Sequence, residues 1–228
     1  MTAGERAWLV LDTSTPIAVV GVVRARLALS EHRVSEPRRH AEGIIDAIDS
    51  ALLAASVALE DIAGIGVGVG PGSFIGVRTG IATAKGLCLG RSIPLVGLPT
   101  LVAIAHSLEL PQGRGMVVVD AKRHEVYAQL VESAAGQVRA LAVPCALSPD
   151  EARVRAASLA FVVGTALGDA AHIPVASPSA VGLARVLAEL IAHNVIDELA
   201  TLAPDYCRPP DAKLPSVDPG VHRPREHS

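Results

Sequence analysis

Residues 62–80, which read IAGIGVGVGPGSFIGVRTG, determine the local fold because alternating glycines precede a Gly-Pro-Gly-Ser turn. The alternation has the two-residue period of a β-strand, and Gly64 to Gly70 leave one face of that strand without side chains. Glycine costs conformational entropy in a strand, so another backbone, a helix or a ligand must pack closely against this face. A helix is predicted from about Ile75 to Leu89, and Ser73 is placed to cap its first turn.

Upstream of this stretch, the sequence predicts three strands and a helix. The strands cover residues 8–12, 17–23 and 25–34, and their short connections indicate antiparallel hairpins. A helix follows from about His40 to Ala58, with an apolar stripe at helical spacing. Downstream, residues 93–96 predict another strand and residues 99–108 another helix.

The pattern then begins again, because Asp12 and Asp120 each end an apolar strand that a turn and a second apolar run follow. The two aspartates lie about half the chain length apart, which predicts an internal duplication. The second half predicts strands at 137–143 and 159–163 and helices at 149–157 and 179–194. We therefore expect an α/β fold of two βββαβα-type half-domains. They cover residues 1–110 and 111–207, and a proline-rich disordered tail covers 208–228.

The bulk composition narrows the class of protein. The formal net charge is -3 and only five of 228 residues are aromatic, so the chain lacks the basic, aromatic-rich composition of a protein that grips RNA alone. Its three cysteines are widely spaced, which predicts reduced thiols and a cytoplasmic location. Prolines interrupt the longest charge-free stretch, residues 92–108, so we expect no membrane span.

Four polar residues are candidates for a nucleotide or anion contact. Asp12 and Asp120 would suit a metal-bound nucleotide if the duplicated strands face one cleft, as in an actin-like or sugar-kinase fold, or each would cap its own turn. Ser73 and Arg78 lie in the first turns of a helix, where backbone amides hold anions. The glycine-rich turn lacks the lysine of a phosphate-binding P-loop, so close packing with a helix cap is the alternative.

Other kinds of catalytic or metal site are not predicted. The eight histidines show no HxxxH or HExxH spacing, and the cysteines show no CxxC pair. No GxSxG elbow is present either. We therefore expect no catalytic residues and no resident metal in this chain.

The helix after His40 carries a second feature, a ridge of small side chains beside its apolar stripe. The ridge consists of Gly43, Ala47, Ser50 and Ala54. Small side chains would let a partner helix approach closely, although an alanine-rich chain would show the same pattern by composition alone.

Several motifs, in order along residues 9–208, strongly resemble the TsaB family, also called YeaZ. The resemblance rests on Leu11-Asp12-Thr13-Ser14-Thr15, His40-Ala41-Glu42, Gly70-Pro71-Gly72-Ser73-Phe74-x-Gly76-Val77-Arg78-x-Gly80, Asp120-Ala121-Lys122-Arg123-His124-Glu125-Val126-Tyr127 and Pro204-Asp205-Tyr206-Cys207-Arg208. The Gly-Pro-Gly-Ser-Phe segment is the most specific of these.

The resemblance implies a duplicated actin-like (ASKHA, ribonuclease-H-like) fold. It also implies a non-catalytic subunit that supports TsaD, the enzyme that transfers threonylcarbamoyl to a tRNA adenosine beside the anticodon. The family pairs with TsaD through helices, and the ATPase TsaE joins them. His40 and Glu42 then join the ridge as partner-binding residues. ATP and metal are expected on the partner proteins, and tRNA only within the complex.

Two positions depart from the family pattern, and two rival functions stay open. Ile75 stands where the family has threonine, and Asp46 where proline is common. The rivals are an actin-like phosphotransferase and a glycoprotease-like enzyme. A homodimer formed through the same helix would compete with TsaD.

Overall fold

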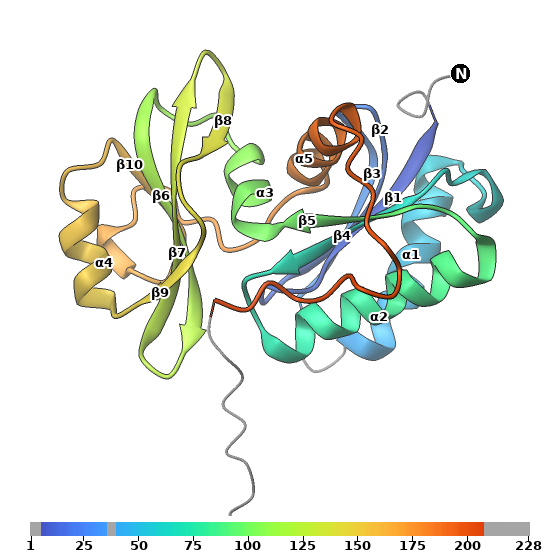
Figure 1. Ribbon diagram of the computed structural model, residues 1–228, viewed down its shortest axis with the longest axis horizontal. Helices are drawn as coiled ribbons and strands as arrows, with labels where there is room; N and C mark the ends of the chain where they lie inside the picture. Colours follow the sequence, from blue (N-terminus) through green and yellow to red (C-terminus); the bar gives the residue numbers. More distant parts are fainter. Residues whose placement is uncertain (1–5, 36–39, 208–228) are drawn as a thin grey trace, which may run out of the picture.

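The computed structural model describes residues 6–35 and 40–207, and of residues 40–42 it describes only the backbone. The predicted disordered tail, 208–228, lies outside the described residues. Two β-sheets stand side by side, one in each half of the chain (Figure 1). Within the described residues, no helix combines the length and apolar character needed to cross a membrane.

The first sheet has the strand order β3-β2-β1-β4-β5. Its strands are β1 (Ala7–Asp12), β2 (Ala18–Arg24), β3 (Leu27–Val34), β4 (Ile65–Gly70) and β5 (Leu95–Pro99). The first three pair antiparallel, as their short connections predict, and β4 and β5 add in parallel on the other side of β1. A strand that runs parallel to its neighbour in the sheet needs a crossover connection, and the helices that precede β4 and β5 supply it.

Helices cover both faces of the first sheet (Figure 1). On one face, α1 (His40–Ala55) and α2 (Phe74–Arg91) pack on a core that includes Leu9, Leu11 and Val67. On the other, α3 (Thr100–His106) and α5 (Ala180–Ala192) pack on a core that includes Trp8 and Val10. Alternate residues of β1 thus serve opposite layers. The short helix η3 (Leu59–Asp61) connects α1 to β4.

The second half repeats the strand arrangement in reduced form. Its elements are β6 (Gly113–Lys122), β7 (Glu125–Ala134), β8 (Gln137–Ala140), β9 (Cys145–Leu147), α4 (Pro149–Ala156), β10 (Phe161–Val163) and η4 (Gly168–Ala170). The first three strands are antiparallel and β10 is parallel to β6, as β4 is to β1. The counterpart of β5 is reduced to a single parallel bridge between Val163 and Ile173. The sequence did not predict β9, which pairs with β7.

Helix α5 crosses the predicted boundary between the half-domains. Leu183 and Leu187 are buried in the core of the first sheet, although the sequence assigned them to 111–207. Helix α3 is shared in the same way, because Ala103 faces that core while Leu101 and Ile104 face Phe161 and its neighbours in the second half. The boundary at residue 110 stays a prediction, but the packing of the two halves is interlocked.

The glycine-rich strand packs as closely as its sequence predicts. A Cβ at Gly64 would overlap the Trp8 ring, and one at Gly66 would lie 2.9 Å from Leu98 Cδ1. A Cβ at Gly68 would overlap the Asp12 carboxylate. Side chains of the neighbouring strands and of α5 therefore fill the face that the glycines leave free.

Gly64→Ala should destabilise the chain by about 1–3 kcal/mol, because the Trp8 ring has to move within a packed core. Gly86→Ala is the matched control. Gly86 lies in α2 with no atom within 4 Å of an added Cβ, so this change should stabilise the chain by up to about 1 kcal/mol through helix propensity. Urea unfolding followed by circular dichroism measures both, and equal effects would contradict this account.

Candidate functional site

The end of β1 carries a fully buried carboxylate, that of Asp12. Its Oδ1 accepts hydrogen bonds from the Ser14 backbone N (2.8 Å) and from Ser14 Oγ (2.6 Å). Its Oδ2 accepts one from Thr100 Oγ1 (2.7 Å), at the start of α3. Burial raises the pKa of Asp12, and the bonds from Ser14 and Thr100 oppose that rise.

This arrangement fits the turn-capping interpretation of Asp12. Its carboxylate has no solvent exposure, and donors of the chain itself occupy both oxygens. The described geometry therefore does not fit a metal-bound nucleotide at Asp12. Among the residues that the structure describes, no group of three His, Cys, Asp or Glu side chains is placed to hold a metal ion.

The start of α2 is pressed against the turn between β1 and β2. Ser73 caps the helix as predicted, since its Oγ accepts a hydrogen bond from Gly76 N (3.2 Å). The Ser73 backbone N donates to Ser14 O (2.7 Å). A Cβ at Gly72 or Gly76 would overlap a carbonyl of this turn, so the glycines of the motif permit the close approach. The hydroxyl and the backbone N–H of Ser73, which the sequence suggested as contacts for an anion, are thus both hydrogen-bonded within the chain.

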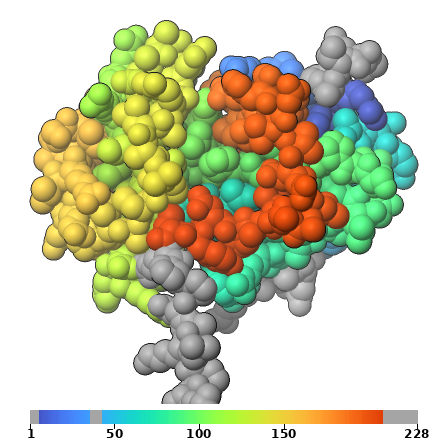
Figure 2. Space-filling view, in the orientation of Figure 1, coloured from blue at the N-terminus to red at the C-terminus, as the bar shows by residue number. Residues whose placement is uncertain are grey.

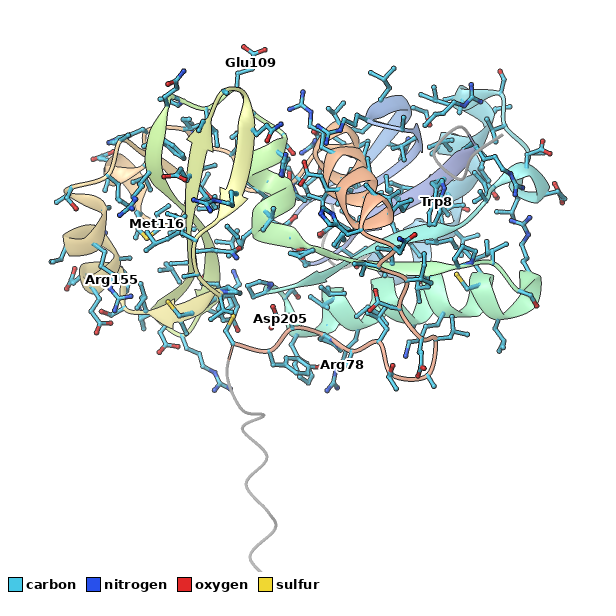
Figure 3. All side chains as sticks on the ribbon, turned by 45° about the horizontal axis from the view of Figure 1, so that its top comes forward. Trp8, Arg78, Glu109, Met116, Arg155 and Asp205 are labelled. Carbon is cyan, nitrogen blue, oxygen red and sulfur yellow. The ribbon has the colours of Figure 1, made fainter. Side chains whose placement is uncertain are left out.

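Arg78 lies one turn further along α2 and contacts aromatic rings. Its guanidinium carbon is 3.7 Å from the centroid of the Phe74 ring and 5.8 Å from that of Tyr206. Its Nε donates a hydrogen bond to the Tyr206 hydroxyl (2.8 Å). Figure 3 shows Arg78 at the edge of the molecule, close to the C-terminal segment that carries Asp205. A nucleotide contact by Arg78 stays a prediction.

Asp120 differs from Asp12, its counterpart in the duplication. It is exposed, and its carboxylate accepts hydrogen bonds from Lys122 N (2.7 Å) and Lys122 Nζ (2.5 Å). Burial acts to raise the pKa of Asp120, but the bonds and charge of Lys122 outweigh it and lower the pKa. The two aspartates thus have different partners and different exposure.

The predicted partner-binding ridge on α1 does not form one surface. Ala47 is 1% exposed and belongs to the core under α1, so it is not accessible to a partner. Gly43 and Ser50 are half-buried, and only Ala54 is exposed. The reason is that part of the ridge turns toward the first sheet together with the apolar stripe. The side chains of His40 and Glu42 lie outside the described residues.

The sequence missed Thr100 and the pairing of Tyr206 with Arg78. Thr100 begins a helix without belonging to any motif, and only the tertiary fold brings it to Asp12. Tyr206 was part of a quoted motif, but nothing in its spacing pointed to α2.

Comparisons with known proteins identify the family of this chain. The family model for TsaD, tRNA N6-adenosine threonylcarbamoyltransferase, matches residues 32–223. The tRNA threonylcarbamoyladenosine biosynthesis protein TsaB of Escherichia coli (strain K12) is 36% identical over 126 residues, 52% of each chain. The structure of YeaZ from Pseudomonas aeruginosa is 27% identical with a TM-score of 0.77, over 88% of this chain and 99% of that one. This chain belongs to the TsaD family and, within it, to the TsaB (YeaZ) group.

A further relative covers more of the chain. An uncharacterised protein of Mycobacterium tuberculosis (strain H37Rv) is 33% identical over 218 residues, which is 90% of this chain and 93% of that protein. The resemblance to TsaB and the duplicated α/β fold class predicted from the sequence are thus confirmed. Both departures from the TsaB pattern, Asp46 and Ile75, lie on the surface.

Thr100→Val should destabilise the chain by about 1–3 kcal/mol, because Asp12 loses a donor and Gly70 N loses its acceptor (3.2 Å). In the parent chain, the hydrogen bond from Thr100 lowers the pKa of Asp12. Its loss in Thr100→Val therefore raises the folded-state pKa of Asp12 further above its ordinary value. The loss of folding stability in Thr100→Val should therefore be full while Asp12 is ionised, and it should shrink as the pH falls through the folded-state pKa of Asp12.

Urea unfolding over a pH series from about pH 8 downward tests this, and the loss of stability should shrink toward the acid end of the series. Thr79→Val is the matched control, since the Thr79 hydroxyl donates to Ile75 O within its own helix. Its effect should stay within about 0.5 kcal/mol throughout the pH series. A loss for Thr100→Val that grows as the pH falls would contradict the role assigned to Asp12.

Proposed function

We propose that this chain acts in tRNA threonylcarbamoyladenosine biosynthesis as a non-catalytic subunit. It binds and supports a TsaD-type threonylcarbamoyltransferase together with the ATPase TsaE. Membership of the TsaB group supports the pathway, since relatives in Escherichia coli and Bacillus subtilis carry the name tRNA threonylcarbamoyladenosine biosynthesis protein. In this proposal, the reaction takes place on the partner enzyme.

The observation that carries the proposal is the outer surface of α1 and α2. These helices lie next to each other over the first sheet (Figure 1) and expose large apolar side chains. Leu53 is 82% exposed and Ile75 is 75% exposed, and Ile45 and Leu89 are exposed as well. Single exposed apolar residues are ordinary, but several on two neighbouring helices are typical of a protein interface.

The glycines of α2 support the same conclusion. An added Cβ at Gly86 or Gly90 would meet no atom within 4 Å, so the fold of the chain does not require glycine at either position. Glycine costs about 1 kcal/mol relative to alanine inside a helix. A partner helix that approaches α2 closely would give both positions a reason to lack a side chain.

The candidate residues for chemistry are consistent with a supporting role. Asp12 accepts a hydrogen bond from Ser14 N in the β1–β2 turn, Ser73 N donates to Ser14 O of the same turn, and Arg78 is bonded to Tyr206. ATP and metal then belong to the partner proteins. The same helices would serve a homodimer when the chain is alone, and that dimer would compete with TsaD.

Reconstitution tests the function directly. Threonylcarbamoylation of tRNA is measured with TsaD, TsaE and the adenylate-forming enzyme, with and without this chain, and the modification should depend on the chain. A mixture with TsaD that stays as two species, even with nucleotide present, would contradict the proposal. ATP turnover or peptide cleavage by the isolated chain, lost in Asp120→Ala, would instead favour the phosphotransferase or glycoprotease alternative.

Leu53→Glu and Gly86→Leu should each weaken binding to TsaD by about tenfold or more, because they place a charge or a bulky group in the proposed contact. Both positions are exposed, so the chain should remain folded. Val154→Glu on α4 is the control, since Val154 is equally exposed but lies in the other half. Titration calorimetry measures the dissociation constants, and equal effects for all three variants would exclude this surface.

A further inference from the structure

The chain uses very few aromatic residues, and two of them meet at the surface. Of its one Trp, two Tyr and two Phe, Trp8 and Phe161 are buried and Tyr127 is half-buried. Phe74 and Tyr206 are 52% and 41% exposed, and their ring centroids are 5.8 Å apart at an interplanar angle of 31°. Burial of apolar surface therefore does not account for both rings.

Arg78 joins the two rings into one surface. Its guanidinium carbon lies over the Phe74 ring while its Nε donates a hydrogen bond to the Tyr206 hydroxyl, and Arg78 is itself exposed. Phe74, Arg78 and Tyr206 together form what we term the stacking platform. It is built from two distant parts of the chain, the first turns of α2 and the C-terminal segment.

A turn with two basic side chains, Lys122 and Arg123, lies toward the same lower end of the molecule as the start of α2 (Figure 1). The hairpin between β6 and β7 exposes Lys122, Arg123 and His124. All three have positive φ angles, of 61°, 53° and 61°, in a left-handed conformation that costs free energy for residues with side chains. Strained backbone of this kind persists where the surrounding structure holds it and is concentrated at functional sites.

The C-terminal segment connects the platform to this hairpin. It runs across the front of the molecule from α5 to the second half (Figure 2). The Asp205 backbone N bonds Val69 O in the first half (2.8 Å), two residues before the end of the described segment. Figure 1 shows the segment ending beside the lower ends of β7 and β9, next to the start of α2.

We infer that the stacking platform and the hairpin of residues 122–124 together contact a single-stranded loop of the tRNA. Unpaired bases in RNA loops are recognised by stacking on aromatic rings and on arginine planes, with cations nearby for the phosphates. The platform supplies the planar groups, and the hairpin supplies two basic side chains, Lys122 and Arg123, next to the carboxylates of Asp120 and Glu125. This inference rests on the proposed function, which brings tRNA to the complex.

The charge of the chain determines when this contact forms. The net charge is -3, and Lys122 is paired with Asp120, so the isolated chain attracts RNA weakly. Stacking is largely independent of net charge, and it adds to binding once a partner holds the RNA in place. The surface therefore acts within the complex.

Two alternatives use the same residues, and two conservative variants separate them. If the cluster only anchors the C-terminal segment, the Arg78–Tyr206 hydrogen bond matters most, so Tyr206→Phe should be the more harmful change. If the cluster stacks on RNA, the rings matter most, so Phe74→Leu should be harmful and Tyr206→Phe mild. If it is a contact with a partner protein, Phe74→Leu should weaken assembly of the complex.

The experiment measures threonylcarbamoylation by the reconstituted complex as the tRNA concentration is varied. Phe74→Leu and Arg78→Ala should each raise KM for tRNA by about fivefold or more, with kcat changed less than about twofold. Tyr206→Phe should stay close to the parent chain. Arg153→Ala is the charge control, because Arg153 is an exposed arginine paired with Asp150 on the distant helix α4. Its KM should not change.

Three results would overturn the inference. They are an unchanged KM in Phe74→Leu, a Tyr206→Phe effect as large as that of Phe74→Leu, and weaker TsaD binding that accounts for the whole change. If the parent chain fails to support TsaD at all, the proposed function has failed. The surface is then tested by photocrosslinking of this chain to an anticodon stem-loop RNA in the presence of TsaD, and crosslinking that Phe74→Leu leaves unchanged would exclude it.

Discussion

The carboxylate of Asp12 holds the first half of the molecule together. It is fully buried, and leaving a buried charge without donors is costly, so the surrounding segments have to supply them. The β1–β2 turn supplies them through Ser14, and the start of α3 supplies one through Thr100. Thr100 in turn accepts from Gly70 at the end of β4. Three strand ends are thereby fixed at the edge of the sheet where α2 and α3 begin.

The position of α3 follows from this connection and extends it to the second half. Thr100 fixes the start of the helix, and its apolar residues then divide between the two cores, with Ala103 in the first and Leu101 and Ile104 in the second. Helix α5 adds a return connection, since it comes from the second half and covers the first sheet. The C-terminal segment adds a third across the front of the molecule. A relative movement of the halves would have to disturb all three connections.

The glycines of the chain have two distinct roles, which relate its stability to its proposed function. Those of the β4–α2 motif let strands and turns approach each other, and a side chain there would overlap Trp8, Asp12 or the β1–β2 turn. Those near the end of α2 have open space around them and weaken the helix without a benefit inside the chain. Helix-weakening glycines of this kind are expected where a surface is shaped for a partner. They lie beside the exposed apolar residues of α1 and α2.

The sequence by itself determined the elements other than β9, and their duplication, because strand and helix periods, the alternating glycines and the Ser73 cap are local signals. It also determined the family, through motifs that are contiguous in the chain. Only the tertiary structure decided which face of each element is exposed and so accessible to a partner. Ala47, predicted to meet a partner, packs into the core, since a ridge and an apolar stripe on one helix cannot be told apart by spacing alone. The partners of Asp12 and Arg78 were likewise hidden, because Thr100 and Tyr206 lie 88 and 128 residues away in the chain. Contacts over such separations leave no periodic signal, and they form only when the sheets and helices have packed.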